Sequence, residues 1–264
     1  MSLFPEPMTD GNILPFRGRG TTAAPVRDLP PVLIVLHQEH STPGRVGNAL
    51  RALGHGLDIR RPRFGDGLPD TLDDHAGAVF FGGPMSANDP DDYVRKEIDW
   101  IEIALREQRP FLGICLGAQM LAIQFGAKVG PHAQGLTQIG YYPIRPTAAG
   151  QALCPDWPDQ VYHWHREGFG LPAGSELLAE GDDFPVQAFR CGNAFGFQFH
   201  PDVTTAMMHC WTTRGSLDHP GAQPRHRHFE GRAMYDVAER AWLAKFIADW
   251  LDTRPAVRMA QAAE

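Results

Sequence analysis

A cysteine between two glycines is the residue in this chain best suited to act as a nucleophile. Cys115 lies between Gly113 and Gly117, after an apolar run at 111–114 and before a helix-forming stretch. A G-x-C-x-G pattern at a strand-to-helix turn is typical of a nucleophile elbow, which lifts the side chain off the sheet. The N-terminus of the next helix favours a thiolate and offers N–H groups to an oxyanion. The alternative is a structural cysteine, since free cysteines are often buried.

A histidine followed by an acid supplies a candidate base for this cysteine. His200 ends the apolar run 195–199, Pro201 stops the strand, and Asp202 follows. An H-x-D placement lets the carboxylate orient the imidazole and select its tautomer, as in Cys-His-acid triads. A lone histidine at a strand end is usually structural, but the cysteine elbow in the same chain favours His200 as a general base.

Two glycines before the elbow form a candidate oxyanion hole. Gly82 and Gly83 follow the apolar run 77–81. Loops after parallel strands gather at one edge of a sheet, where ligands bind. These glycines can present N–H groups to a developing negative charge, together with the N–H of Leu116 after the nucleophile. Gly82-Gly83-Pro84 is also compatible with an ordinary type II turn.

The elements that must position these residues alternate between strands and helices. Their β-α-β-β-α-β-α order favours an α/β fold with a parallel sheet covered by helices on both faces. Ser41 or Thr42 is expected to cap the first helix, with Pro43 in its first turn. Apolar runs predict strands at 32–36, 57–59, 77–81 and 111–114, and periodic stretches predict helices at 43–54, 89–109 and 116–125.

The sequence of the second half of the chain predicts a smaller group of antiparallel strands. Residues 126–146 alternate as in antiparallel strands or a hairpin. A short strand or loop is expected at 161–165, and short strands at 177–179, 186–189 and 194–200. We expect a helix at 203–211, an irregular loop at 214–230, and a C-terminal helix at 231–252 with an apolar stripe of Ala238, Trp242, Phe246 and Trp250. Residues 1–30 are expected to form a disordered arm, and residues 31–264 a single domain.

Composition excludes several classes of protein. The 264 residues are 43% hydrophobic and carry a net charge of −7, which disfavours a nucleic-acid surface. The chain has neither an apolar run long enough to span a membrane nor an apolar leader typical of secretion. Its four cysteines form no C-x-x-C and no metal-ligand spacing. We therefore expect a cytoplasmic protein with free thiols, acting without a metal or organic cofactor.

Three blocks in order resemble the signature motifs of class I glutamine amidotransferases. They are Gly82-Gly83-Pro84, residues 113–119 around Cys115, and residues 198–202, Gln-Phe-His-Pro-Asp. Gly83 precedes Cys115 by 32 residues and His200 follows it by 85, a spacing that also resembles the family. The resemblance covers residues 32–205 and is strongest to stand-alone proteins like the amidotransferase domain of GMP synthase. It implies the flavodoxin-like fold of that family.

The resemblance also implies a role for each site residue. Cys115 is expected to be the nucleophile, His200 the base and Asp202 the third member of the triad, with Gly83 and Leu116 as the oxyanion hole. The family usually has Glu where this chain has Asp202, so the shorter carboxylate is expected to reach the imidazole directly, through a small backbone shift or through a water. The substrate-binding residues are expected to be Gly82, Gln119 and one of His163 and His165, together with Ser86 and Met85 beside the oxyanion loop.

The implied reaction is hydrolysis of the glutamine side-chain amide to glutamate and ammonia through a cysteinyl thioester. The chain has no P-loop motif and, after residue 205, too few residues for a synthetase domain. Either an ammonia-accepting synthase subunit is the partner, or the protein acts alone on another γ-glutamyl amide. A catalytically silent binding or regulatory protein is the alternative of another class, although the intact cysteine, histidine and acid argue against it.

Overall fold

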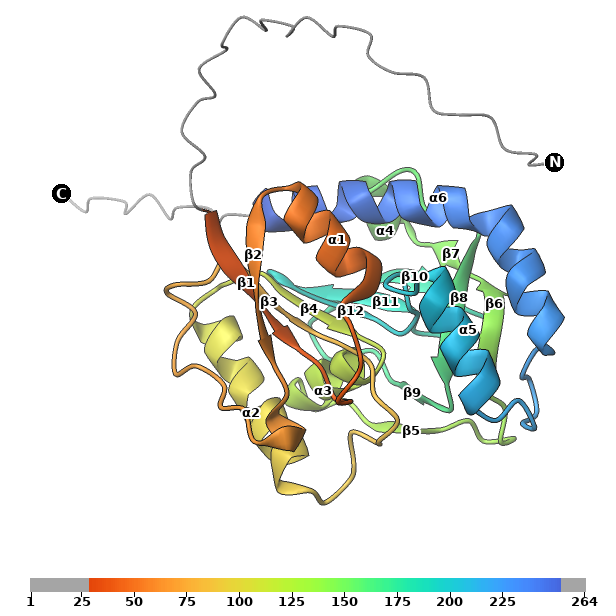
Figure 1. Cartoon of the computed structure of the whole chain (residues 1–264), viewed down its shortest axis with the longest axis horizontal. Coiled ribbons are helices and arrows are strands. Elements are labelled where there is room, and N and C mark those ends of the chain that lie inside the picture. The colour runs from red at the N-terminus through yellow and green to blue at the C-terminus, as the bar shows by residue number, and fades with distance from the viewer. Residues whose placement is uncertain (1–28, 253–264) are drawn as a thin grey trace, which may run out of the picture.

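The computed structural model describes residues 29–252 of the chain (Figure 1). The arm predicted at residues 1–30 lies outside the described residues, except for Leu29 and Pro30. These two residues begin the first strand, β1 (Leu29–Val35), which starts three residues earlier than the apolar run at 32–36 predicts. The side chains of these two residues are exposed, so they are not part of the buried apolar run from which the strand was predicted.

An eight-stranded sheet forms the centre of the described residues, in the order β2-β1-β3-β4-β12-β11-β10-β7. The first five strands of this order pair in parallel and the last three join antiparallel. The predicted α/β class with a mostly parallel sheet is therefore confirmed. After β1, the strands are β2 (His55–Arg60), β3 (Gly77–Phe80), β4 (Phe111–Ile114), β7 (Arg145–Pro146), β10 (Glu176–Glu180), β11 (Ala188–Cys191) and β12 (Ala194–Phe197).

Helices cover both faces of this sheet (Figure 1). The side chains of β1 show the two faces, because Val32 and Ile34 pack into one apolar cluster and Leu33 and Val35 into the other. The first cluster lies against α1 (Gly44–Ala52), α4 (Ala148–Leu153) and α6 (Arg225–Asp252), and the second against α2 (Asp92–Arg106) and α3 (Leu116–Gln124). The remaining helices are η1 (Pro62–Phe64) and α5 (Thr205–Arg214). Among the described residues, no helix combines the length and apolar character needed to cross a bilayer.

Two small antiparallel sheets lie beside the main one. Strand β5 (Val129–Pro131) pairs with β9 (Glu167–Phe169), and β6 (Gln138–Pro143) pairs with β8 (Gln160–His165). The antiparallel strands predicted at 126–146 are confirmed, but the hairpin is not, since each strand takes its partner from residues 160–169. One contact that favours the distant pairing is between Tyr141 and Tyr162, which are opposite each other in the two strands. Their ring centroids lie 5.2 Å apart in an edge-on arrangement.

The C-terminal helix is longer than predicted, because α6 begins at Arg225 rather than at residue 231. Tertiary contacts hold its first turns: His228 is buried and bonds to the Tyr162 hydroxyl, and Gly231 lies against the ring of Tyr141. The predicted irregular loop at 214–230 is thus wrong beyond residue 224. In the predicted stripe, Ala238 is exposed, whereas its neighbour Glu239 is buried.

The start of α1 also differs from the prediction. Pro43 occupies the N-cap position, and no side chain caps the helix. The hydroxyl of Ser41 instead donates to the carbonyl of Gln38. The N–H of Arg45, the second residue of the helix, donates to the carbonyl of Asp202 at 2.9 Å. This helix start is therefore satisfied by a tertiary contact, which local sequence does not reveal.

The parallel arrangement brings the sequence motifs to one edge of the sheet. Strands β3, β4 and β12 are neighbours, and their carboxyl ends lead to Gly82, Cys115 and His200. Carboxyl ends of parallel strands meet at the same edge, where α/β proteins bind ligands. The candidate site lies at this edge.

Candidate functional site

Cys115 adopts a strained backbone conformation between β4 and α3. Its φ of 51° and ψ of −104° lie in a region that L-residues rarely occupy, at a cost of about 1–3 kcal/mol. Two hydrogen bonds hold the turn: the N–H of Cys115 donates to Phe197 at 2.7 Å, and that of Gly117 donates to Phe81 at 3.2 Å. The side chain is 5% exposed and lines a cavity. This geometry is that of a nucleophile elbow.

The two glycines that flank Cys115 are needed for this turn. A Cβ on Gly117 would lie 2.1 Å from the carbonyl oxygen of Phe80, and one on Gly113 would lie 2.4 Å from that of Gly117. Backbone atoms cannot yield as a flexible side chain can, so any larger residue would push α3 away from the sheet.

His200 and Asp202 form a buried pair beside the cysteine. The imidazole Nδ1 lies 3.2 Å from Oδ1 of Asp202, and both side chains are about 5% exposed or less. The backbone N–H of His200 donates to Tyr162 at 2.7 Å, and its ring packs edge-on against Trp211. The imidazole is thus held from three sides.

The protonation of His200 depends on its two neighbours. Burial by itself lowers the pKa of His200, but the charges of Cys115 and Asp202, and hydrogen bonds to both, raise it to about 10. The ring therefore carries a proton at neutral pH, between a sulfur and a carboxylate. A protonated imidazole beside a cysteine can donate to a leaving group.

The glycine loop lies directly against this pair. A Cβ on Gly82 would be 2.6 Å from Cε1 of His200 and 3.4 Å from Cβ of Cys115, so only glycine fits. Within residues 29–252, neither the N–H of Gly83 nor that of Leu116 has a hydrogen-bond acceptor. Both groups can therefore receive an oxyanion.

A cavity of about 270 Å³ opens at the sulfur of Cys115. His165 lines it, whereas His163 lies behind, fully buried, with its Nδ1 3.1 Å from Nε2 of His165. Burial lowers the pKa of His165 to about 3 and that of His163 also falls well below its usual value, so both rings are neutral near pH 7. His165 Nδ1 donates to the carbonyl of Glu167, which leaves its Nε2 to accept from His163.

Of the other expected binding residues, Gln119 lies in the cavity wall and Ser86 does not. The amide of Gln119 donates to the carbonyl of Glu167 at 3.0 Å, which ties α3 to β9. The N–H of Ser86 donates to the carboxylate of Asp89 and its hydroxyl accepts from Asn88, so Ser86 serves a local turn. Met85 lines the cavity in its place.

Two charged residues in the cavity wall have no sequence motif to mark them. Arg166 and Glu167 follow His165 directly, and both of these oppositely charged residues line the same cavity. A zwitterionic amino acid carries the complementary pair of charges. In the described part of the chain, no group of three or more His, Cys, Asp or Glu side chains is arranged to hold a metal ion.

A second, larger cavity of about 820 Å³ lies on the imidazole side. His200 and Asp202 line it, together with Trp211. It shares Gly83, Pro84 and Trp164 with the smaller cavity, so the two meet where Cys115 and His200 face each other.

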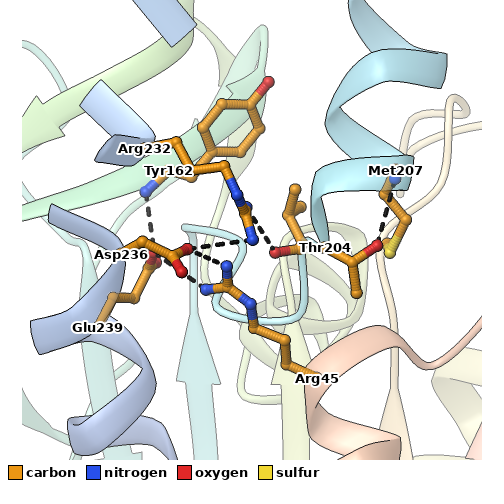
Figure 2. Close-up of polar contacts among 8 residues, drawn as sticks. Arg45, Tyr162, Thr204, Met207, Arg232, Asp236 and Glu239 are labelled. Carbon is orange, nitrogen blue, oxygen red and sulfur yellow. Dashed lines mark hydrogen bonds and ion pairs between the residues drawn. The ribbon is translucent and has the colours of Figure 1, made fainter. Parts of the chain in front are cut away.

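A cluster of charged residues supports the loop after His200 (Figure 2). Arg45 of α1 contacts Asp236 and Glu239 of α6, while Arg232 contacts Asp236 and donates to the carbonyl of Val203 at 3.3 Å. Glu239 in turn accepts a hydrogen bond from the backbone N–H of Tyr162. The carbonyl of Tyr162 accepts the hydrogen bond from the N–H of His200. Helices α1 and α6 thus brace the imidazole and its acid from outside the cavity.

Comparison with known proteins places this geometry in context. A family model described as glutamine amidotransferase class-I matches residues 40–209. Glutamine amidotransferase-like protein YfeJ of Salmonella typhimurium is 30% identical over 222 residues, covering 80% of this chain and 90% of that protein. A glutamine-hydrolysing GMP synthase subunit from Ignicoccus hospitalis is 32% identical over 142 residues, covering 53% of this chain and 70% of that protein.

Solved structures agree on the fold. A glutamine amidotransferase from Methylobacillus flagellatus superimposes with a TM-score of 0.77 at 24% identity, covering 85% of this chain and 95% of that one. Another, from Thermotoga maritima, gives a TM-score of 0.75 at 26% identity, with 84% and 98% covered. The matched range of the family model spans Gly82, Cys115 and His200.

Proposed function

The chain belongs to the class-I glutamine amidotransferase family, and from this premise we propose that it hydrolyses the side-chain amide of glutamine. The observation that carries the proposal is the contact between a strained Cys115, which lines the cavity of about 270 Å³, and the His200–Asp202 pair beside it. The products are glutamate and ammonia. Arg166 and Glu167 bind the α-carboxylate and the α-ammonium group of the substrate.

The proposed reaction proceeds through a covalent intermediate. The thiolate of Cys115 attacks the amide carbon, and the resulting oxyanion accepts from the N–H groups of Gly83 and Leu116. The imidazolium of His200 gives its proton to the nitrogen, the C–N bond breaks and ammonia leaves. Water then loses a proton to His200 and attacks the thioester. The C–S bond breaks, glutamate forms, and Cys115 returns to its starting state.

The test is release of glutamate and ammonia from glutamine by the full chain. We expect Cys115→Ala to lower kcat by at least about 10³-fold, as loss of a nucleophile does. Cys191→Ala is the matched control, because its thiol lies at the end of β11 and lines neither cavity. Activity that survives in Cys115→Ala would exclude this nucleophile. A folded wild type that cleaves no γ-glutamyl amide would support a silent binding protein.

The ammonia acceptor is proposed to be a separate synthase subunit. The proposal is supported by the similarity to glutamine-hydrolysing GMP synthase chains of Ignicoccus hospitalis and Methanocaldococcus jannaschii, both of which are named as subunits. Addition of such a synthase, with its nucleotide substrates, is expected to raise kcat for glutamine several-fold. No change in kcat and no complex in size-exclusion chromatography would contradict this pairing.

The larger cavity favours a second candidate function, hydrolysis of N-substituted γ-glutamyl amides. Its volume of about 820 Å³ and its wall of Trp164, Trp211 and Arg214 leave room for an amine larger than ammonia on the imidazole side. The test compares kcat/KM for γ-glutamyl-ethylamide, γ-glutamyl-4-nitroanilide and glutamine. A substituted amide cleaved as fast as glutamine or faster would favour this candidate. A loss of more than about 100-fold for both would exclude it.

A further inference from the structure

A second buried histidine–acid pair lies behind the glycine loop, outside both cavities. His37 follows β1, and its Nε2 lies 2.9 Å from Oε2 of Glu97 on α2. Both side chains are fully buried. The other ring nitrogen, Nδ1, lies 3.2 Å from the carbonyl oxygen of Gly82. The pair therefore connects helix α2 to the candidate oxyanion loop.

The hydrogen-bond partners determine which nitrogen of His37 carries a proton. The carbonyl oxygen of Gly82 can only accept, so Nδ1 must donate to it. The Nε2 atom faces a carboxyl group, and two arrangements keep the proton on Nδ1. Either the ring is an imidazolium that also donates from Nε2 to the carboxylate of Glu97, or the ring is neutral and its Nε2 accepts from a protonated Glu97. In both arrangements the Nδ1–H is available to the carbonyl of Gly82.

The same peptide unit carries the N–H of Gly83. Peptide bonds in residues 29–252 are all trans, so this N–H points opposite to the carbonyl that His37 binds. A Cβ on Gly83 would lie 2.9 Å from Cβ of His37, whereas one on Gly82 would meet the ring of His200 at 2.6 Å. The loop is thus enclosed between His37 on one side and the candidate catalytic pair on the other.

We propose that His37 and Glu97 are positioning residues for the N–H of Gly83. His37 donates a hydrogen bond to the carbonyl of Gly82, Glu97 holds His37 in place, and the N–H of Gly83 is thereby oriented towards the oxyanion. The inference rests on the proposed amide hydrolysis, and it adds a pair that never touches the substrate. A peptide unit free to rotate would lose this donor in part of the population. Fixing it before the reaction avoids reorganisation when negative charge develops.

Stability alone does not account for the pair. Replacing a buried ion pair by apolar residues is often neutral or stabilising, because two groups must be taken out of water. The second carboxyl oxygen of Glu97 is buried and has no partner among the described residues, which adds to this cost. A pair kept for stability would not be expected to carry such a defect. The double variant His37→Leu/Glu97→Leu is therefore expected to unfold no more easily than wild type.

The test separates oxyanion stabilisation from the reactivity of the thiol. His37→Leu removes the donor to Gly82, while His37→Asn keeps an N–H donor at the position of Nδ1. We measure kcat and KM for glutamine, and the rate at which iodoacetamide alkylates the thiol of Cys115. In alkylation the S–C bond forms as the C–I bond breaks and iodide leaves, so no oxyanion develops on the reacting carbon.

We expect His37→Leu to lower kcat by about 10²–10³-fold, the effect of losing one oxyanion donor, with KM within about threefold and alkylation unchanged. His37→Asn is expected to restore most of kcat. If His37→Leu fails to fold, Glu97→Gln and Glu97→Ala repeat the test, because glutamine can still donate to Nε2 and alanine cannot. Unchanged kcat, or equal losses of kcat and alkylation, would overturn the inference. A wild type without glutaminase activity would instead overturn the proposed function.

Discussion

The Nδ1 atom of His200 lies 3.2 Å from Oδ1 of Asp202, so this acid contacts the imidazole directly although it is one methylene shorter than the usual glutamate. The start of α1 explains how. The N–H of Arg45 donates to the carbonyl of Asp202, and a Cβ on Gly44 would lie 2.0 Å from that oxygen. Close packing of this helix against its carbonyl holds the backbone of Asp202 in place beside the ring.

Removing the charge of Asp202 should change both rate and pH dependence. Asp202 helps to raise the pKa of His200 to about 10, so Asp202→Asn is expected to move the alkaline limb of kcat/KM to lower pH. The rate falls because His200 must be protonated to release ammonia. We expect a loss of about 10²-fold in kcat, smaller than for His200→Ala. A pH–rate profile of both variants checks this, and Asp202→Glu should retain the limb. An unshifted limb in Asp202→Asn would contradict the assignment.

Adding one methyl group to the glycine loop should displace the base. In Gly82→Ala the new Cβ would approach Cε1 of His200 to 2.6 Å, and the ring must move. A shift of about 1 Å in a catalytic group can cost about 10²-fold in rate. Steady-state kinetics on glutamine measure the effect. Gly67→Ala is the matched control, since its Cβ would meet no atom within 4 Å. Equal rates in the two variants would rule out the close approach.

The two neutral histidines should make the fold sensitive to acid. The pKa values of His163 and His165 are lower in the folded chain than the ordinary 6.5, so the unfolded chain binds more protons below that pH. Their stabilising contribution is present above pH 6.5 and is lost as pH falls towards about 3. Urea unfolding between pH 5 and 7 should show the free energy of unfolding rising with pH. His163→Phe is expected to reduce this slope by about one linked proton, and an unaltered slope would refute the explanation.

Glu239 should have the opposite effect. Burial raises its pKa to about 8, against the nearby charge of Arg45, so the folded chain binds more protons than the unfolded chain above pH 4.5. Its contribution therefore falls as pH rises from about 4.5 to 8. Glu239→Gln removes this dependence. We therefore expect the free energy of unfolding of the variant, relative to that of wild type, to increase as pH rises towards 8. The exposed Glu102→Gln is the control, for which the difference from wild type should not vary over this range.

The positions of the candidate catalytic residues were largely predictable from local sequence. A strand ending in G-x-C-x-G and another ending in H-P-D place their side chains through the turn itself. The glycines at 113 and 117 are required by contacts with backbone atoms of neighbouring turns and strands. Parallel strands also bring their carboxyl ends together, so residues 32 and 85 positions away from Cys115 were expected at the same edge.

Contacts between residues far apart in the sequence determined several features that local sequence patterns did not reveal. An H-x-H pattern puts both histidines on one face of a strand, and only the packing of β8 shows that His165 lines the cavity while His163 lies behind it. The hydroxyl of Ser86 accepts from the backbone of its own turn, and Ser86 does not line the cavity at Cys115. Helix α6 starts six residues early because His228 and Gly231 are buried against aromatic rings.

The sequence by itself indicated the fold class and the residues of the proposed trio, because the strand and turn pattern that marks each of them extends over only a few residues. Tertiary structure alone decided the second pair, His37 and Glu97. These residues lie 60 positions apart, on a strand end and a helix. Glu97 falls on the apolar face of α2, where a charge has no local partner to explain it. Its role becomes evident only when folding brings His37 and the carbonyl of Gly82 alongside, since hydrogen bonds act only over a few ångströms.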